Sequence, residues 1–466
     1  MTHSSGRLVG CMCGDASIGR AQARRYTPNG DDVKIAFIYP NFERHADSHP
    51  ELKEFVPANE YLGPPSMGIA NVAATTPDGH EIAYFDDRVE AFDCDTEADV
   101  YALSFFTPAA TRGMELCDEL LKRGKTVVAG GIFPSMMPDE VAPHVSSLVI
   151  GEGEPVWAQL LEDIEKGQLK PRYHGEGGEL GTYPPPRLDL YLGAEREGHH
   201  PDDYPLQLSR GCPMQCDACV LPIHLGRKMR FQSDENLIYT MKVLTEAGKL
   251  ISFTEDTSVT FAYGARRKFR TFLELCLELQ QGGLPLRFSY LGISMPMILH
   301  LDDDLFNLLA KTGIDRFYLV GGFDTITRQA FGTGDMKAMD KAERAIARCQ
   351  EKNIDPYVSF LMGNPDDDDK VFQRMVDFAR RTGIDLAEFC VSTPYPNTPI
   401  WHRLIGEDRI FDFTWKHYND SNVVFQPHHM SAEALRDGYL YTWREFYSGR
   451  RADLTEREHQ RKTIQF

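Results

Sequence analysis

The sequence feature that most limits the possible folds is a repeated alternation of short apolar segments with amphipathic segments. In the first part of the chain, apolar runs with strand character are followed by stretches with the apolar spacing of helices. We predict strands at 33–39, 81–85, 100–106, 126–129 and 147–150, and helices at 66–74, 112–123 and 156–166. Apolar strands separated by helices pair in parallel and are covered on both faces. Residues 32–170 are therefore predicted to form a doubly wound, Rossmann-like α/β domain.

A second alternating stretch follows a segment at 171–205 that is rich in proline and glycine and is predicted to be a linker. We predict strands at 206–209, 250–253, 286–293, 316–319, 356–361 and 386–391, and helices at 235–247, 266–281, 301–312, 338–352 and 368–382. Six such units suit an incomplete parallel barrel better than a second open sheet. The prediction is a partial (β/α)6 TIM-like barrel over 206–400, with a helical C-terminal region at 401–466 and a flexible leader at 1–31.

Composition and charge exclude several classes of protein. Of the 466 residues, 42 % are hydrophobic and 26 % are charged, which is typical of a soluble globular protein. The net charge of −19 argues against nucleic acid as the main partner, because there is no basic field to release counterions. No apolar run approaches the roughly 18 residues that span a bilayer, and residues 1–25 do not resemble a signal peptide. We therefore expect a cytoplasmic protein without a transmembrane segment.

Three cysteines lie close together directly after the first predicted barrel strand. The segment reads Ser209-Arg210-Gly211-Cys212-Pro213-Met214-Gln215-Cys216-Asp217-Ala218-Cys219. These thiols fall in a loop at the carboxyl end of a barrel strand, where the active sites of barrels are built. Soft sulfur ligands at this spacing select zinc or an iron–sulfur centre.

The number of thiols distinguishes between these two kinds of site. Structural zinc takes four ligands, and the next cysteine after Cys219 is Cys276. Three thiolates leave one iron of a [4Fe–4S] cluster open to coordinate a substrate. A plain zinc site with His224 as its fourth ligand is the alternative. The pair Cys11 and Cys13 is predicted to be exposed tail thiols rather than a metal site.

The Cys-x3-Cys-x2-Cys motif after the first strand of a βα barrel resembles the radical S-adenosylmethionine superfamily. The resemblance implies that Cys212, Cys216 and Cys219 hold a [4Fe–4S] cluster. It also implies that the open iron binds the amino and carboxylate groups of S-adenosylmethionine, and that an electron from the cluster cleaves this cofactor to a 5′-deoxyadenosyl radical. One residue departs from the family pattern, because Ala218 stands where the family usually has an aromatic or bulky residue near the adenine.

Later segments resemble the family's motifs at the ends of further barrel strands. Thr254-Glu255-Asp256 follows the second strand, where the family places polar groups for the methionine amine, and a carboxylate can accept hydrogen bonds from an ammonium group. Ser294 falls at the usual position of a ribose contact, and Gly321-Gly322-Phe323-Asp324-Thr325 resembles a glycine-rich stretch in which Asp324 replaces the usual glutamate. The resemblance thus implies S-adenosylmethionine contacts at Glu255, Asp256, Ser294, Gly322 and Asp324.

The first domain resembles the cobalamin-binding domain that precedes the barrel in one large branch of this superfamily. The matching segments lie at predicted strand ends and are Leu62-Gly63-Pro64-Pro65, Ser104-Phe105-Phe106, Gly130-Gly131-Ile132-Phe133-Pro134 and Gly151-Glu152-Gly153-Glu154. Small residues there let a flat macrocycle approach the backbone, and such sheets bind ligands at the carboxyl ends of their strands. The cobalamin contacts implied by the resemblance are Leu62, Gly63, Ser104, Phe105, Gly130, Gly131, Phe133, Gly151 and Glu152.

The resemblance covers the chain from Asp32 to Tyr447 and includes Trp157 and the segment Arg227-Lys228-Met229-Arg230. An Asp-x-His-x-x-Gly motif for a lower axial histidine is absent, because Asp47-Ser48-His49 is followed by Leu52 where glycine is needed. The lower face of a bound cobalamin is therefore expected to lie against side chains. The alternative is a first domain that has lost its ligand and only packs on the barrel.

The resemblance implies a cobalamin-dependent enzyme that methylates an unactivated carbon of a small-molecule or natural-product substrate. The runner-up is a radical enzyme of the same architecture that does not methylate but catalyses a cyclisation, a rearrangement or a diol dehydration, with or without cobalamin. A third possibility is a non-catalytic iron–sulfur or zinc protein, which the lack of a fourth cysteine disfavours. The expected partners are the small-molecule substrate and an external reductant of the flavodoxin or ferredoxin type. The sequence does not indicate a catalytic residue or the substrate.

Overall fold

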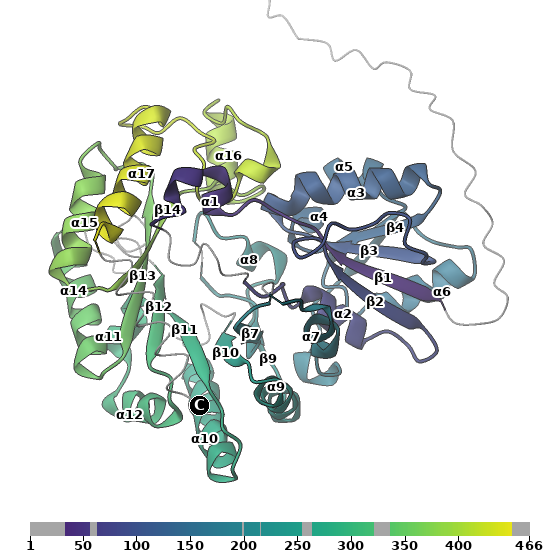
Figure 1. The fold of residues 1–466 in the computed structure, drawn as a ribbon, viewed down its shortest axis with the longest axis horizontal. Helices are drawn as coiled ribbons and strands as arrows, with labels where there is room; N and C mark the ends of the chain where they lie inside the picture. Colours follow the sequence, from purple (N-terminus) through teal and green to yellow (C-terminus); the bar gives the residue numbers. More distant parts are fainter. Residues whose placement is uncertain are drawn as a thin grey trace, which may run out of the picture.

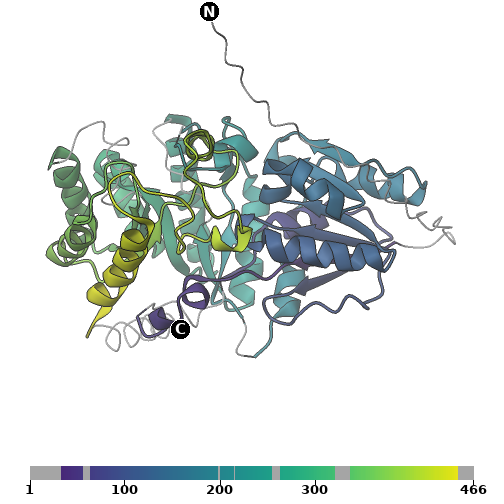
Figure 2. The same ribbon diagram turned by 90° about the horizontal axis from the view of Figure 1, so that it is seen from above.

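The computed structural model describes residues 33–55, 63–197, 200–214, 216–253, 263–320 and 336–449. Several predicted positions lie outside these residues: Leu62, Glu255, Asp256, Gly322, Asp324, Cys11 and Cys13. No helix of the described ranges is long and apolar enough to cross a membrane. Two parallel sheets organise the chain, and the units built on them lie side by side (Figure 1, Figure 2).

The first sheet has the strand order β2-β1-β3-β4-β5-β6, and all its strands are parallel. Its strands are β1 (Lys34–Tyr39), β2 (Glu81–Asp86), β3 (Val100–Ser104), β4 (Thr126–Gly130), β5 (Ser147–Gly151) and β6 (Arg172–Gly175). The first four residues of β3 are buried, as expected for an apolar strand covered on both faces. Helices lie on both sides of this sheet, with α3 (Ala110–Lys122) on one side and α7 (Leu188–Ala194) on the other (Figure 1). The predicted doubly wound α/β sheet is confirmed.

Strand β6 falls within the segment that was predicted to be a linker. It pairs with β5, and Tyr173 is its one buried residue. The Tyr173 hydroxyl donates a 2.7 Å hydrogen bond to Asp163 of α6 (Trp157–Glu165). Because only one side chain of this strand is buried, its sequence contains no apolar run from which a strand could be predicted. The first sheet therefore extends to Gly175.

The second sheet has the strand order β14-β13-β12-β11-β10-β7, so its parallel strands follow one another in chain order. They are β7 (Asp203–Leu206), β10 (Leu250–Phe253), β11 (Phe288–Ser294), β12 (Arg316–Val320), β13 (Asp355–Met362) and β14 (Leu386–Val391). Among the described strands, β7 and β14 do not pair with each other, so the barrel stays open. Figure 1 shows the curved sheet with α10–α15 along its outer side. The predicted partial barrel is confirmed.

The start of the barrel differs from the prediction. The first barrel strand, predicted at 206–209, is β7 at Asp203–Leu206. Ser209 and Arg210 instead form the short strand β8, which pairs in antiparallel fashion with β9 (Arg230–Phe231). Leu206 and Ser209 belong to one apolar stretch, so its pattern alone does not reveal the break between the two strands. The cysteine segment is consequently closed at its base by a small hairpin.

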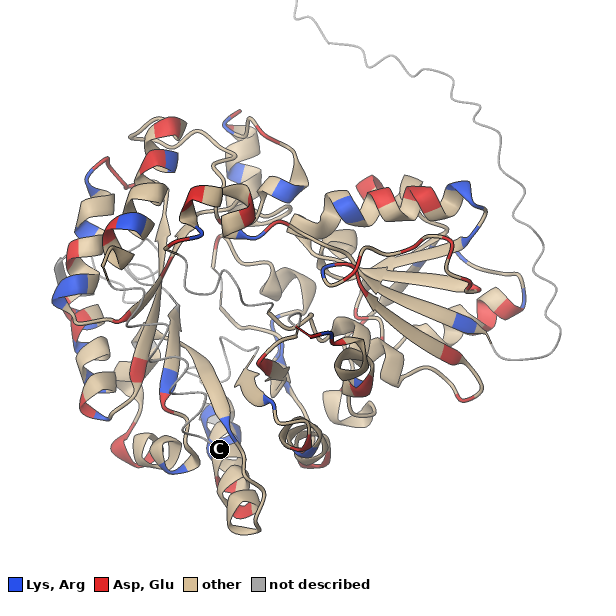
Figure 3. Cartoon of the chain, in the orientation of Figure 1, with Lys and Arg blue, Asp and Glu red and all other residues tan. Residues whose placement is uncertain are grey.

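The remaining helices cover the two sheets. In the first half they are α1 (His45–Ser48), α2 (Gly68–Ala74), α4 (Ile132–Met136) and α5 (Pro138–Val141). In the second half they are α8 (Leu221–His224), α9 (Asp234–Glu246), α10 (Tyr263–Gln281), α11 (Met295–His300), α12 (Asp303–Thr312), α14 (Met336–Glu351), α15 (Val371–Arg381), α16 (Pro399–Gly406) and α17 (Ala432–Tyr447). Helix α12 begins where Asp302 accepts a hydrogen bond from the backbone of Leu305 and ends at Gly313 in the left-handed conformation. Most charged side chains lie on helices and loops rather than on the central strands (Figure 3).

The C-terminal part of the chain packs against both sheets. On the barrel side, Trp443 of α17 donates a hydrogen bond from Nε1 to the carbonyl of Phe389 in β14. On the other side, the ring of Trp415 contacts that of Phe133 at a centroid distance of 5.1 Å. The Nε1 of Trp415 also donates to Glu140 of α5. Aromatic side chains of this segment thus connect the barrel to the first sheet.

Candidate functional site

The three cysteines lie in the loop between β8 and α8. Gly211 opens this loop with a φ of +89°, and a Cβ there would lie 2.2 Å from the carbonyl oxygen of Lys228, so only glycine fits. The backbone N–H of Cys212 donates to the carbonyl of Gly226, which holds the two ends of the loop together. Cys212 is buried, whereas Cys216 and Cys219 are half-buried. The backbone N–H of Cys219 donates to the carbonyl of Cys216 across a tight turn.

The loop offers three thiols, and sulfur is the ligand type that zinc and iron–sulfur centres take. None of the described cysteines forms a disulfide. Burial, and then the neighbouring Cys212 thiol, raise the pKa of the Cys216 thiol. In the described ranges, however, no three histidine, cysteine or carboxylate side chains stand together as metal ligands. The structure therefore places the three thiols on one short loop without setting them in ligand geometry, and it does not join His224 to them as a fourth ligand.

A cavity of about 490 Å³ lies between the first sheet and the cysteine loop. The carboxyl ends of β3, β4 and β5 form one wall, where Ser104, Gly130 and Gly151 are found. The opposite wall includes Cys212 and His224. The cavity thus opens at the strand ends at which such a sheet binds its ligands, and the proposed cluster loop borders it directly.

The predicted cobalamin contacts are distributed as follows. Those that line the cavity are Ser104, Phe105, Gly130, Gly131, Gly151 and Glu152. Phe133 is fully buried and packs its ring against Phe105 and Trp415 instead. The carbonyl of Gly63 accepts a hydrogen bond from Arg88. Of the predicted S-adenosylmethionine contacts, only Ser294 is described, and it is the last residue of β11, at the carboxyl end of the strand.

Two of the cavity glycines are required by the backbone itself. Gly131 has a φ of +96°, and a Cβ there would lie 2.8 Å from the Oγ of Ser104. Gly151 has a φ of +85°, and its Cβ would lie 2.3 Å from the carbonyl oxygen of Gly175 in β6. Gly130 has only ordinary contacts, the nearest atom being the Cβ of Val149 at 3.5 Å. Close packing of neighbouring loops therefore accounts for Gly131 and Gly151, apart from any ligand.

Sequence reasoning did not predict several of the cavity residues. Tyr39, Met67, Gln207 and Leu221 line the cavity without having been predicted as contacts, and so do Trp157, which was named only as part of the resemblance, and His224, which was named only as an alternative zinc ligand. The Nδ1 of His224 is buried and has no hydrogen-bond partner, and burial lowers the pKa of this imidazole. These residues come from separate segments, so no local spacing in the sequence marks them as one set.

A buried ion network joins the Gly151-Glu152-Gly153-Glu154 loop to the cysteine loop. Arg210 donates from Nη1 to Glu152 at 2.9 Å and from Nη2 to Glu154 at 2.6 Å. Arg230 donates from Nη1 to Glu152 at 3.0 Å and also pairs with it through Nη2. The four side chains are 4 to 8 % exposed. Burial alone would raise the pKa of Glu152, but the hydrogen bond from Arg230 and the charges of both arginines hold it below its usual value.

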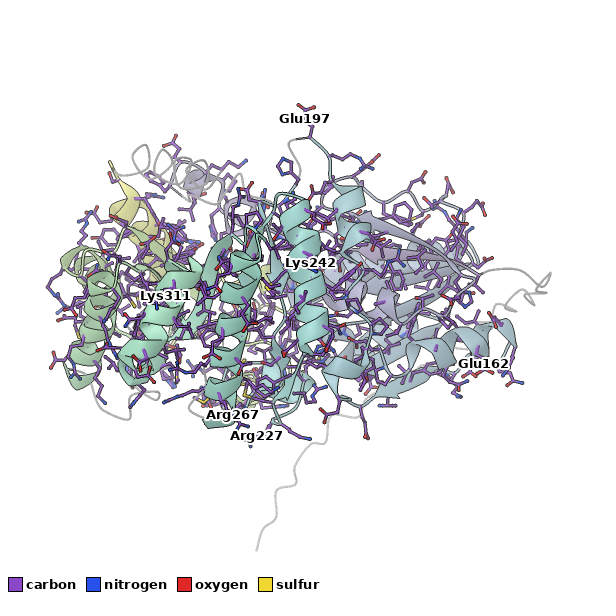
Figure 4. The ribbon with its side chains drawn as sticks, turned by 90° about the horizontal axis from the view of Figure 1, so that it is seen from below. Glu162, Glu197, Arg227, Lys242, Arg267 and Lys311 are labelled. Atoms are coloured by element: carbon purple, nitrogen blue, oxygen red, sulfur yellow. The ribbon has the colours of Figure 1, made fainter. Side chains whose placement is uncertain are left out.

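The segment that follows the cysteines is divided between surface and interior. Arg227 and Lys228 are exposed, and Figure 4 shows Arg227 at the surface of the molecule. Arg230 is buried in the ion network. Arg230 therefore joins the buried network, and the exposed Arg227 donates a 3.3 Å hydrogen bond to the carbonyl of Pro213 in the cysteine loop.

Polar side chains cover the inward face of the second sheet. Residues of β13 alternate between buried and partly exposed, and the buried Phe360 packs against Phe378 of α15 on the outer side. On the opposite, inward face, the rings of Tyr318 and Tyr357 lie 5.1 Å apart. The hydroxyl of Tyr318 donates a 2.5 Å hydrogen bond to Glu388. Burial, and then the charge of Glu388, raise the pKa of both tyrosines.

Comparison with known proteins gives three results. A family model described as a domain of unknown function (DUF4070) matches residues 398–460. Two relatives are bacteriochlorophyllide d methyltransferases of Chlorobaculum tepidum. The C-12(1) enzyme is 26 % identical over 75 % of this chain and 75 % of its own length, and the C-8(2) enzyme is 26 % identical over 81 % and 86 %.

Among solved structures, the chain is similar in fold to TsrM of Kitasatospora setae, a radical S-adenosylmethionine methyltransferase solved with cobalamin and a [4Fe–4S] cluster bound. The TM-score is 0.60 at 16 % identity, over 87 % of this chain and 85 % of TsrM. The two-sheet architecture and the cysteine loop at the start of the barrel agree with this likeness. The chain therefore shares the two-sheet fold of TsrM and is similar in sequence to the two bacteriochlorophyllide d methyltransferases.

Proposed function

We propose that this chain is a radical S-adenosylmethionine enzyme that methylates an unactivated carbon of a small-molecule substrate with the help of cobalamin. The observation that carries the proposal is the cavity that the strand ends of the first sheet share with the cysteine loop. A cofactor held at the strand ends would meet the cluster loop across a single space. The names of the two Chlorobaculum relatives, which methylate bacteriochlorophyllides, support methyl transfer for this chain.

The cysteine loop supplies the ligands of the iron–sulfur cluster. Cys212, Cys216 and Cys219 bind three irons, and the absence of a fourth protein thiolate leaves the remaining iron to S-adenosylmethionine. When bound, the cluster supplies the electron that cleaves S-adenosylmethionine. Ser294, at the end of β11, contacts the ribose. Glu255, Asp256, Gly322 and Asp324 are proposed as further contacts on the sequence resemblance alone.

The cavity would hold the corrin of cobalamin, and cobalamin, when bound, would supply the metal that carries the methyl group. Ser104, Phe105, Gly130 and Gly131 present backbone and small side chains to it. Tyr39, Met67 and Trp157 also line the cavity, and their aromatic and apolar side chains would help to exclude water from a bound cofactor. Leu62, Gly63, Phe133, Gly151 and Glu152 are proposed contacts whose roles rest on the resemblance.

The substrate is proposed to lie against the inward face of the barrel sheet. Tyr318 and Tyr357 offer hydroxyls and ring faces there, and Glu388 offers a carboxylate. An external flavodoxin- or ferredoxin-type reductant in the cytoplasm is proposed as the electron source. The domain bounds 1–31, 32–170, 171–205, 206–400 and 401–466 also stay predictions.

Anaerobic reconstitution tests the proposed function. The protein is loaded with iron, sulfide and hydroxocobalamin and is then given S-adenosylmethionine and a strong reductant. We expect 5′-deoxyadenosine from the wild type and none from the variant with Cys212, Cys216 and Cys219 changed to alanine. Equal yields from both proteins would refute the radical assignment.

Two further measurements separate methylation from the runner-up reactions. A corrin absorption spectrum that survives desalting, together with S-adenosylhomocysteine formed beside 5′-deoxyadenosine, supports methyl transfer. Formation of 5′-deoxyadenosine without either signal would instead support a cyclisation, rearrangement or dehydration on the same architecture.

A further inference from the structure

The acidic loop after β5 is hydrogen-bonded to both ends of the cysteine loop. Arg210 stands two residues before Cys212, and Arg230 stands in the strand that closes the same loop. Both arginines donate to Glu152, and Arg210 also donates to Glu154. The chain separation between Glu152 and Arg210 is 58 residues. Glu152 follows β5 of the first sheet, whereas Arg210 lies in the β8–β9 hairpin.

This network is the most buried ionic contact between the first sheet and the cysteine loop that the described residues contain. All four charged groups lie almost entirely out of solvent. A buried charge is strongly unfavourable unless it is paired and hydrogen-bonded. Each arginine therefore strongly favours the one arrangement in which its guanidinium is hydrogen-bonded to the carboxylates. Because each guanidinium donates through two nitrogen atoms, its orientation is fixed as well.

The other restraints on the cysteine loop do not come from the first sheet: the backbone N–H of Ile400 donates to the carbonyl of Asp217, and Arg227 donates to the carbonyl of Pro213. Among the described residues between β8 and β9, the only regular element is the four-residue helix α8. The backbone bond from Cys212 to Gly226 closes the loop but does not tie it to the first sheet. Further along the loop, Asp217 pairs with Arg403 at 3.2 Å, and both of these side chains are well exposed. A surface pair of this kind restrains position much less than a buried network does.

We infer that Glu152 and Glu154 are positioning residues that set the cysteine loop against the cavity, and that they couple ligand binding in the cavity to the state of the cluster. The inference rests on the proposed function for the identity of the two cofactors. Glu152 and Glu154 both line the cavity, as do Arg210 and Cys212, so a ligand in the cavity contacts the network and the loop together. Because coupling between two sites is reciprocal, each cofactor changes the affinity for the other by the same factor.

A purely adhesive network would behave differently. It would hold the β8–β9 hairpin against the first sheet, and weakening it would lower stability without changing how one cofactor affects the other. A positioning network predicts that a conservative change uncouples the cofactors while the fold and the cavity survive. The two interpretations therefore predict different ratios between the affinity for one cofactor in the presence of the other cofactor and in its absence. They do not differ only in the melting temperature.

The test uses Glu152→Gln, which keeps the shape of the side chain and removes its charge. Asp87→Asn is the matched control, because Asp87 is a buried carboxylate paired with Arg112 at 2.8 Å and lies outside the cavity lining. Glu154→Gln, which removes only the ion pair with Arg210, replaces the first variant if that one does not fold. The measurement is the dissociation constant of hydroxocobalamin for the full chain, with and without the reconstituted cluster.

We expect the cluster to change the affinity of the wild type for hydroxocobalamin at least fivefold, and Asp87→Asn to keep that ratio. The ratio should fall close to one in Glu152→Gln. Addition of S-adenosylmethionine should shift the electron paramagnetic resonance spectrum of the reduced cluster in the wild type. In Glu152→Gln the size of this shift should differ from that in the wild type. An unchanged ratio and an unchanged spectrum in Glu152→Gln would overturn the inference.

Hydrogen exchange separates this result from failure of the proposed function. In the protein without cofactors, backbone amides of residues 211–229 should exchange at least tenfold faster in Glu152→Gln than in the wild type or in Asp87→Asn. Equal exchange in all three proteins would overturn the positioning role whatever the cofactors are. If the wild type took up neither cluster nor cobalamin while the exchange difference held, the proposed function would fail and the positioning role would stand.

Discussion

The hydroxyl of Tyr395 donates a 3.0 Å hydrogen bond to the carboxyl group of Asp420, inside the part of the barrel that the C-terminal segment closes. The two residues are 25 positions apart and follow β14 from different loops. Burial raises the pKa of Asp420 to about 6, although hydrogen bonds from Tyr395 and Thr393 oppose this shift, and the charge of Glu388 adds to it. Asp420 is therefore protonated in the folded protein at pH values where it is ionised in the unfolded chain.

This shift predicts that the stability of the protein depends on the charge of Asp420. An acid whose folded pKa is raised favours the folded state at low pH, and that contribution is lost as pH rises from about 4 through about 6. Asp420→Asn cannot ionise, so its free energy of unfolding relative to the wild type should rise by about 1–3 kcal/mol between pH 4.5 and pH 8. Urea unfolding at the two pH values measures this. The exposed change Asp437→Asn is the control, and an equal difference at both pH values would contradict the prediction.

A second prediction concerns the neighbouring glycines at the end of β4. Gly131→Ala places a Cβ 2.8 Å from the Oγ of Ser104 at a φ of +96°, whereas Gly130→Ala meets nothing nearer than 3.5 Å. A non-glycine residue in such a conformation costs about 1–3 kcal/mol. Gly131→Ala should therefore lower the free energy of unfolding by that amount, and Gly130→Ala by much less. Thermal and urea unfolding compare the two, and equal losses would show that the local backbone is not the cause.

His224 gives a third prediction. Its Nδ1 is buried without a hydrogen-bond partner and its side chain lines the cavity, so a ligand in the cavity can supply the missing bond. His224→Leu should leave the stability of the free protein unchanged or higher, because an unsatisfied buried polar atom is removed. The same change should weaken binding of hydroxocobalamin at least fivefold.

His80→Leu is the matched control for that experiment, because the Nδ1 of His80 is also buried without a partner but His80 does not line the cavity. Spectrophotometric titration of both variants with hydroxocobalamin makes the comparison. If the two histidine changes affected the titration equally, His224 would have no special contact with the cavity ligand.

The fourth prediction concerns the iron content of the cysteine loop. Cys216→Ala should lower the iron bound after anaerobic reconstitution from about four atoms per chain to well under half of that, because a [4Fe–4S] cluster relies on each of its thiolates. Cys349→Ala is the control, since Cys349 is fully buried in the barrel and far along the chain from the loop. Iron and sulfide assays and the visible absorption of the cluster give the readout. Full iron content in Cys216→Ala would exclude that thiol as a ligand.

The sequence alone located most strands and the cysteine loop. Strand β10 at Leu250–Phe253 and strand β14 at Leu386–Val391 have the bounds that the apolar pattern predicted. The prediction of these strands is correct because a strand of a parallel sheet is buried on both faces and therefore consists of a nearly continuous run of apolar residues. The spacing of Cys212, Cys216 and Cys219 is equally local, because one short loop carries all three ligands.

Only the tertiary structure decided what the other site residues contact. Glu152 was predicted as a cofactor contact, and the fold also places it between Arg210 and Arg230. The fold also buries the Nδ1 of His224 beside the cavity without a hydrogen-bond partner. Strand β6 formed through pairing with β5, although its own sequence buries only Tyr173. Periodicity records which face of an element is buried, whereas a partner 58 residues away depends on how two sheets meet, and no local pattern encodes that.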